Sequence, residues 1–301
     1  MIISVCVCTY KRLEWLGFLL KSLLSQKTKG LFSYEIVVVD NDAAGSAEPL
    51  VKQIKESQSE ISISYHVQPQ KNIALARNTA VQNAAGQWLA FIDDDEYPDP
   101  QWLLHLFNSL NESGFDGVLG PVLPIFDVEP EEWIKKGRFF ERENLPAGTN
   151  LLWNETRCGN VLIRSKIFKD EKIYFNSQFG HCGGEDSDFF KRAMEKGFCF
   201  GWSRESVVYE HVPEKRCSLK YIIDRGMRTA TNYSMIALED KKIGQKILFL
   251  AKAMISVIFR MLVWPIACLF GLPGIVKNLN ELCRNAAKAN YCLRSMHPAA
   301  H

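Results

Sequence analysis

Four consecutive carboxylates at residues 93–96, Asp-Asp-Asp-Glu, are the clearest chemical feature of this sequence. They follow the small and apolar segment 86–92, which has the composition of a short buried strand. Adjacent carboxylates repel one another, and the repulsion raises their pKa values unless a metal ion or a basic side chain offsets it. Oxygen ligands at this density suit Mg2+ or Mn2+, and Mg2+ is usually held by one or two carboxylates together with substrate phosphates. The run therefore predicts a divalent-metal site that takes a diphosphate, and the alternative is a solvated acidic loop.

The elements that must position this run alternate between strand and helix. Predicted strands and helices follow one another over residues 2–9, 13–24, 35–40, 61–67 and 72–80. This alternation is typical of an open parallel sheet, which binds its ligands at the carboxyl ends of the strands. Thr9 and Asp40 end the first two predicted strands, so we expect them to meet the acidic run in one crevice.

The loop after the first strand lacks the glycines of a phosphate-binding fingerprint. Neither GxGxxG nor GxxxxGK[ST] occurs there, so a diphosphate must be held mostly by metal and side chains. A nucleotidylyltransferase shares the sheet and the metal chemistry, but it usually opens with a Gly-rich loop that also carries Arg or Lys. That alternative is therefore less favoured.

Four short motifs carry a resemblance to a known family. They are Val-Cys-Thr-Tyr-Lys-Arg at 7–12, Val-Val-Asp-Asn at 38–41, Ala-Arg-Asn at 76–78 and Gly-Gly-Glu-Asp-Ser-Asp at 183–188. In order and spacing they resemble the family 2 inverting glycosyltransferases of GT-A fold, over about residues 2–235. The first and last motifs look most like the bacterial subgroup that builds exopolysaccharides such as succinoglycan. The resemblance implies an α/β fold with a mostly parallel sheet flanked by helices and a C-terminal helical appendage.

The resemblance also implies where the nucleotide-sugar donor binds. The implied donor-binding residues are Thr9, Tyr10, Arg12, Asp40, Arg77, Asp93 and Asp94. Tyr10 offers a stacking face to the base, and Asp40 can accept the imide N–H of uracil. Arg77 would contact the diphosphate or the base, Asp93 the ribose, and Asp95 would be the direct ligand of Mn2+ or Mg2+. The alternatives are a surface helix charge for Arg77 and a core aromatic for Tyr10.

The pair Glu185-Asp186 is expected to carry the reaction. Inverting transfer needs one general base that takes the proton of the acceptor hydroxyl, and the resemblance points to Asp186. Glu185 would orient the acceptor or the helix that runs over 186–196. The positive N-terminal end of that helix favours an ionised Asp186. The alternative is that these acids merely satisfy the first N–H groups of the helix.

Other candidates are less specific. His211 stands where many family members carry a histidine that reaches the metal, and the alternative is a core or surface histidine. Trp153 is a candidate for stacking on an acceptor sugar, although such residues are more often core anchors. His181 lies near the catalytic pair in sequence and either faces the acceptor or belongs to a solvated loop.

The last sixty residues differ from the rest in charge. Residues 1–240 hold 27 Lys+Arg and 33 Asp+Glu, a net −6, whereas 241–301 hold nine Lys+Arg and one Glu, a net +8. The sequence thus predicts a catalytic domain over 1–240, with a nucleotide-sugar half at 1–100 and an acceptor half at 101–240, and a basic, apolar helical tail at 241–301. An amphipathic or re-entrant segment on anionic lipid is favoured, at the cytoplasmic face of the inner membrane. The alternative is a helical cap that packs on the catalytic domain.

These features together predict an inverting glycosyltransferase. It would move a sugar, such as a hexose, from a UDP-sugar to a hydroxyl of a growing, lipid-linked bacterial surface glycan. The expected partners are the nucleotide-sugar donor, a glycan or lipid-linked oligosaccharide acceptor and a membrane surface, with no nucleic acid. A non-catalytic nucleotide-sugar or glycan-binding module is the second alternative, but it need not keep Asp95, Glu185-Asp186 and His211 together.

Overall fold

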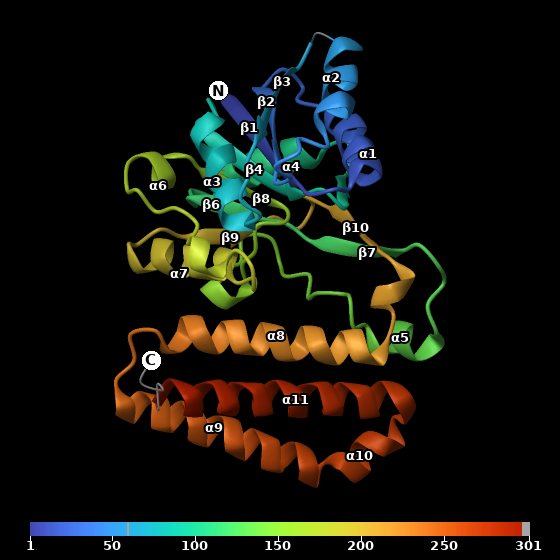
Figure 1. Cartoon of the computed structure of the whole chain (residues 1–301), viewed down its shortest axis with the longest axis vertical. Helices are drawn as coiled ribbons and strands as arrows, with labels where there is room; N and C mark the ends of the chain where they lie inside the picture. The colour runs from blue at the N-terminus through green and yellow to red at the C-terminus, as the bar shows by residue number, and fades with distance from the viewer. Residues whose placement is uncertain (59, 297–301) are drawn as a thin grey trace. The chain divides into compact units, whose positions relative to one another are not determined.

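The computed structural model describes residues 1–58 and 60–296, and the chain forms two compact units (Figure 1). The first unit comprises Met1–Ile125, Glu141–His181 and Glu185–His211. The second unit comprises Phe126–Phe140, Cys182–Gly184 and Val212–His301. The predicted boundary at residue 240 falls inside the second unit, between α8 (Leu219–Leu238) and α9 (Ile243–Leu262).

A seven-stranded sheet is the centre of the first unit. Its strands are β1 (Ile2–Thr9), β2 (Ser33–Asp40), β3 (Ser62–Val67), β4 (Trp88–Asp93), β6 (Gly117–Leu119), β8 (Val161–Arg164) and β9 (Phe200–Trp202). The strand order is β3-β2-β1-β4-β8-β6-β9. The first four strands are mutually parallel, whereas β8 runs antiparallel to both of its neighbours. The predicted mostly parallel sheet is confirmed.

Helices cover both faces of this sheet. They are α1 (Leu13–Leu24), α2 (Glu48–Glu56), α3 (Ile73–Asn83), α4 (Trp102–Ser113), α6 (Lys166–Lys169) and α7 (Glu185–Glu195), with short 3-10 turns at Trp153–Glu155 and Ser177–Phe179. Alternate residues of each strand point to opposite faces, so the buried side chains form two core clusters. Ile3, Val5 and Val7 of β1 pack with α1, α2 and α4 in one cluster. Cys6 and the partly buried Cys8 belong to the other cluster, which also includes α3, α6 and α7.

A second, three-stranded sheet has the order β5-β10-β7. Its strands are β5 (Glu96–Pro98), β10 (Val208–Val212) and β7 (Val122–Phe126). β5 begins at Glu96, the last residue of the acidic run, and β10 pairs with it in antiparallel register, with Glu210 opposite Glu96. This pairing brings β10, late in the chain, next to the end of β4.

The second unit is helical. It contains α5 (Glu132–Gly137), the 3-10 turn Glu214–Arg216, α8, α9, α10 (Trp264–Leu269) and α11 (Gly271–Met296). α11 packs against both α8 and α9 and lies between them (Figure 1). The predicted C-terminal helical appendage is therefore present. Among residues 1–58 and 60–296, no helix is long and apolar enough to cross a membrane.

Candidate functional site

The carboxyl edge of the large sheet gathers the polar strand ends. In the β1–β2 register Thr9 lies opposite Asp40, and in the β1–β4 register Cys8 lies opposite Asp93. The predicted meeting of Thr9, Asp40 and the acidic run at one sheet edge is confirmed. The parallel register is the reason, because parallel strands end on the same side.

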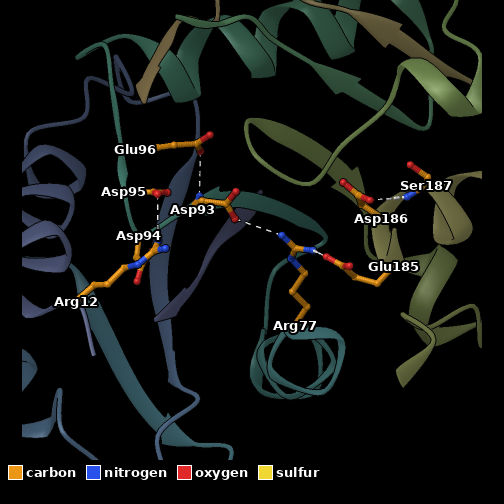
Figure 2. A network of polar contacts seen from close by, with 9 residues as sticks. All are labelled: Arg12, Arg77, Asp93, Asp94, Asp95, Glu96, Glu185, Asp186 and Ser187. Carbon is orange, nitrogen blue, oxygen red and sulfur yellow. Dashed lines mark hydrogen bonds and ion pairs between the residues drawn. The ribbon is translucent and has the colours of Figure 1, made fainter. Parts of the chain in front are cut away.

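Arginine 12 offsets the repulsion within the acidic run (Figure 2). Its guanidinium Nη1 lies 2.8 Å from Asp94 Oδ1 and 3.0 Å from Asp95 Oδ2. Thr9 Oγ1 also donates a hydrogen bond of 2.8 Å to Asp94 Oδ2. Burial nevertheless raises the pKa of Asp94 from its ordinary value of 3.8 to about 6, against the opposing effect of Arg12 and Thr9. The basic side chain that offsets the repulsion within this run is thus Arg12.

Glu96, the last residue of the run, supports the turn that presents the others. Its Oε2 accepts the backbone N–H of Asp93 at 3.0 Å, and the side chain is buried. Burial and then the neighbouring charge of Asp93 raise the pKa of Glu96 well above its ordinary value. A Cβ at Gly159 would lie 2.7 Å from Glu96 Oε1, so a larger residue there would displace the Glu96 carboxylate. A separate role for Glu96 is not apparent in the sequence, where its place in the acidic run is its only signal.

Arginine 77 links the acidic run to the start of α7 (Figure 2). Its Nη2 lies 3.2 Å from Asp93 Oδ1, and its Nη1 hydrogen-bonds to Glu185 Oε1. The residue is buried on the sheet-facing side of α3, where small neighbours such as Ala74 and Ala80 leave room for a guanidinium. The alternative of a surface helix charge is therefore wrong. A contact between Arg77 and a nucleotide stays a prediction.

Glu185 and Asp186 begin α7 in different surroundings. Glu185 is buried, and burial raises its pKa although the charge of Arg77 opposes this. Among the described residues, nothing hydrogen-bonds to Glu185 Oε2. Asp186 is only half-buried, and its Oδ1 accepts the N–H of Ser187 at 2.7 Å. Sequence neighbours thus differ in access, because successive helix positions point about 100° apart.

The two glycines that precede this pair, Gly183 and Gly184, have positive φ angles. The φ of Gly183 is 82° and that of Gly184 is 100°. Such positive values are rarely adopted by residues with a Cβ. The Gly-Gly of the motif is therefore required by the turn that starts α7.

His211 lies beside Asp95 through the backbone of β10. The His211 N–H donates to the Asp95 carbonyl at 3.1 Å, so the second sheet holds the two residues next to each other. The imidazole also meets the ring of Trp15 edge-on, with 3.9 Å between centroids. Trp15 of α1 is not among the site residues predicted from the sequence.

The donor set of Asp95 and His211 fits a divalent cation such as Mn2+. It offers a carboxylate oxygen and an imidazole nitrogen, both of which Mn2+ accepts. Over residues 1–58 and 60–296, no cluster of three or more His, Cys, Asp and Glu is arranged to hold a metal. An ion that takes most of its ligands from a diphosphate needs only one or two protein ligands. Their roles as metal ligands stay predictions.

The residues expected at the nucleotide base show two different environments. Tyr10 is half-buried, and the ammonium of Lys71 lies 4.3 Å from its ring centroid. Asp40 is fully buried, and its carboxylate accepts the N–H groups of Asp42 and Ala47 and the hydroxyl of Tyr65. In this structure Asp40 fixes the loop after β2, and a contact with a base would require that loop to rearrange. The base-binding roles stay predictions.

Trp153 and His181 lie in contrasting surroundings. Trp153 is partly buried against the second core cluster, as a core anchor would be. His181 is exposed at the end of its segment. Stacking of Trp153 on an acceptor sugar stays a prediction.

Arg157 is a buried cation that is not among the predicted site residues. Its Nη2 donates to the Gly120 carbonyl at 2.9 Å, and its guanidinium lies 5.8 Å from the centroid of Trp202. Burial, and then the charge of Arg142, lower the pKa of Arg157 to about 9. Its burial could not be read from the sequence, because it depends on contacts with Gly120 and Trp202, which are distant in the chain.

Comparisons with known proteins identify the family. Residues 4–170 match the model of Glycosyl transferase family 2. The chain is 33% identical over 240 residues to the succinoglycan biosynthesis protein ExoM of Rhizobium meliloti, covering 79% of this chain and 75% of that protein. It is 23% identical to the hyaluronan synthase of Pasteurella multocida over 70% of this chain but only 24% of that protein.

The fold has solved counterparts. Residues 1–349 of Staphylococcus aureus TarS, in a crystal structure with UDP-GlcNAc, align with a TM-score of 0.56 at 17% identity. The alignment covers 97% of this chain and 91% of that one, and at this identity it concerns the fold alone. The chain therefore belongs to glycosyl transferase family 2, has the GT-A fold and is a glycosyltransferase.

Proposed function

We propose that this enzyme transfers a sugar from a UDP-sugar to a hydroxyl of a growing bacterial surface glycan, with inversion at the anomeric carbon and Asp186 as the general base. The observation that carries the proposal is the difference between Asp186 and Glu185. Glu185 is buried and pairs with Arg77, whereas Asp186 is half-buried and accepts a hydrogen bond from the backbone N–H of Ser187.

A base must reach the proton that it removes. A general base acts over a hydrogen-bond distance, so it needs a carboxylate oxygen open to the acceptor. Asp186 satisfies this condition better than Glu185, and the first turn of α7 favours its ionised form. Glu185 then serves to hold the start of α7 against Arg77. Inverting transfer needs one accessible base, whereas retention by double displacement would need a nucleophile on the protein in addition.

The donor proposal rests on the sheet edge and on the solved relatives. TarS 1–349 has been crystallised with UDP and with UDP-GlcNAc. In this chain the corresponding half presents Thr9, Tyr10 and the acidic run at the carboxyl edge, where α/β sheets bind nucleotides. We assign UDP to that edge.

A divalent metal would be held by Asp95, with His211 beside it. When bound, Mn2+ or Mg2+ stabilises the negative charge of the departing nucleoside diphosphate. Arg12 forms an ion pair with Asp95. It would therefore have to share or release that carboxylate in a complex with the metal ion. Arg12 is 44% exposed and therefore has room to turn toward the diphosphate.

The names of the relatives support the proposed acceptor class. ExoM is a succinoglycan biosynthesis protein, and hyaluronan synthase builds a glycan chain. We propose a growing extracellular polysaccharide as the acceptor, linked to a lipid carrier during its synthesis.

Two measurements test the function. Calorimetry with UDP and GDP, each with Mn2+ and with chelator, should show binding of UDP that depends on metal. NMR of the product formed from an α-linked UDP-sugar should show a β linkage. Binding without transfer to any glycan would favour a sugar-binding module instead, and an α-linked product would contradict inversion.

A further inference from the structure

The second unit exposes an unusual amount of apolar surface. The described residues include 26 exposed large hydrophobic side chains, and 13 of them fall between residues 243 and 272. These are Ile243, Ile247, Leu248, Met254, Ile255, Ile258, Phe259, Met261, Leu262, Ile266, Leu269, Phe270 and Leu272. We call this set the α9–α10 face. Contiguous apolar surface of this kind marks an interaction site.

The part of the α9–α10 face that lies on α9 is one continuous side of that helix. At about 100° per residue, its exposed large apolar residues from Ile243 to Leu262 fill an arc of about 160° that contains no charge. Ala253, the one buried residue of α9, points to the opposite side. Lys246 and Arg260 project toward that buried side as well, and Lys252 stands at the border of the arc.

α9 is attached to α11 along its whole length. Near its start Lys246 Nζ donates to the Ser295 carbonyl at 3.3 Å, and Cys292 Sγ donates to the Lys246 carbonyl at 3.2 Å. Near its end Asn278 Nδ2 donates to the Arg260 carbonyl at 2.9 Å. The helix thus shows only one side to its surroundings. A partner has to be flat or broad to cover it, and α9 has to lie along that partner.

We propose that the α9–α10 face lies in the interface of an anionic lipid bilayer, with α9 parallel to the membrane plane. An apolar helix side with few charges and basic residues at its borders is the form of an interfacial helix. Segment 241–301 carries nine Lys+Arg and one Glu, a net +8, and anionic headgroups attract such a segment. Lys241, Lys242 and Lys252 are exposed and supply basic groups at the start and border of the face.

Charge favours a bilayer over a second copy of the chain. A symmetric dimer through this face would bring two segments of the same +8 charge together, and like charges oppose that contact. A bilayer with anionic lipid accepts both the apolar arc and the lysines. This inference goes beyond the proposed function, because it concerns neither donor nor base.

Flotation of the full chain with vesicles tests the inference. The chain should bind vesicles that contain phosphatidylglycerol more strongly than vesicles of phosphatidylcholine alone, and salt should weaken the binding. The double variant Ile255→Glu/Leu262→Glu should bind about tenfold less per substitution, since each removes a large apolar side chain from the interface. The triple variant Lys241→Gln/Lys242→Gln/Lys252→Gln should lose about fivefold per lysine on anionic vesicles.

A matched control has the same added charge elsewhere. Phe18→Glu/Leu31→Glu replaces residues that are 53% and 54% exposed outside the face, and it should bind as the natural chain does. The inference is overturned if the natural chain binds neither vesicle type, or if the control loses as much as Ile255→Glu/Leu262→Glu. A dimer in light scattering that this double variant converts to a monomer, without vesicle binding, would identify a second copy as the occupant. Equal binding to both vesicle types would overturn the role of the lysines.

Discussion

The first unit has two acidic regions, the run 93–96 and the start of α7, and their negative charges are compensated in different ways. In the run 93–96, one arginine contacts two neighbouring carboxylates, Asp94 and Asp95. At the start of α7, Arg77 contacts Glu185, and in the described part of the chain it forms no ion pair with Asp186. A shared cation suits a place where a metal and a diphosphate exchange with the protein. A cation given to one neighbour leaves the other carboxylate available as a base.

Arg77 also connects the two regions. It pairs with Asp93 on one side and with Glu185 on the other, as Figure 2 shows. The end of β4 and the start of α7 are therefore fixed relative to each other within the first unit. We therefore expect metal and donor binding to depend on the run 93–96, and removal of the acceptor proton to depend on Asp186.

The largest effect is expected from the base. Asp186→Asn should lower the rate of sugar transfer by about 100- to 10,000-fold, because the general base is removed. Metal-dependent binding of UDP, measured by calorimetry, should stay unchanged. The control Glu195→Gln alters an exposed acid at the far end of α7 and should transfer normally. Normal transfer by Asp186→Asn would show that the base lies elsewhere.

Loss of the connecting arginine should act on stability. Arg77→Met leaves Glu185 buried without its partner, so the free energy of unfolding in urea should fall by about 3–5 kcal/mol. Arg77→Met/Glu185→Gln should recover part of that loss, because the buried charge is removed as well. The control Lys136→Met breaks an exposed pair with Glu132 and should cost less than about 1 kcal/mol. Equal losses for the single and double variants would contradict the pairing.

The metal ligand should be separable from its neighbour. Asp95→Asn should weaken Mn2+-dependent binding of UDP about tenfold or more, which corresponds to ~1.4 kcal/mol. Asp94→Asn should weaken it less, since Asp94 is held by Thr9 and Arg12 inside the protein. With chelator present, the difference between the two variants should vanish. Retained Mn2+ dependence in Asp95→Asn would sink the metal assignment.

The smallest effect concerns pH. The pKa of Asp94 rises from 3.8 to about 6 on folding, so between these values the folded chain keeps a proton that the unfolded chain releases. The contribution of Asp94 to stability is therefore present below about pH 4 and is lost as the pH rises toward 6. Asp94→Asn should flatten the fall in the free energy of unfolding over this interval. An unchanged slope would mean that Asp94 titrates normally in the folded chain.

The sequence by itself determined several strands and helices of the first unit and the sheet edge at which they end. Residues 2–9 and 13–24 form β1 and α1 with the predicted bounds, and the helix predicted over 186–196 is α7, Glu185–Glu195. Such elements follow from local periodicity and composition, which neighbouring residues alone carry. The motifs at 7–12 and 183–188 likewise predicted the family, which the comparisons confirm.

Only the tertiary structure decided which charges meet. Repulsion within the acidic run predicts a metal ion or a basic side chain beside it. That this side chain is Arg12 depends on how β1 and β4 pair. The sequence predicts a donor contact for Arg77, with a surface charge as the alternative, but it does not show that α3 packs Arg77 against Asp93 and against Glu185, which is 108 positions away in the chain. The exposure of the α9–α10 face similarly depends on which side of α9 meets α11. The physical reason is the same in each case: burial and ion pairing are properties of distant segments brought together, and local sequence preference does not contain them.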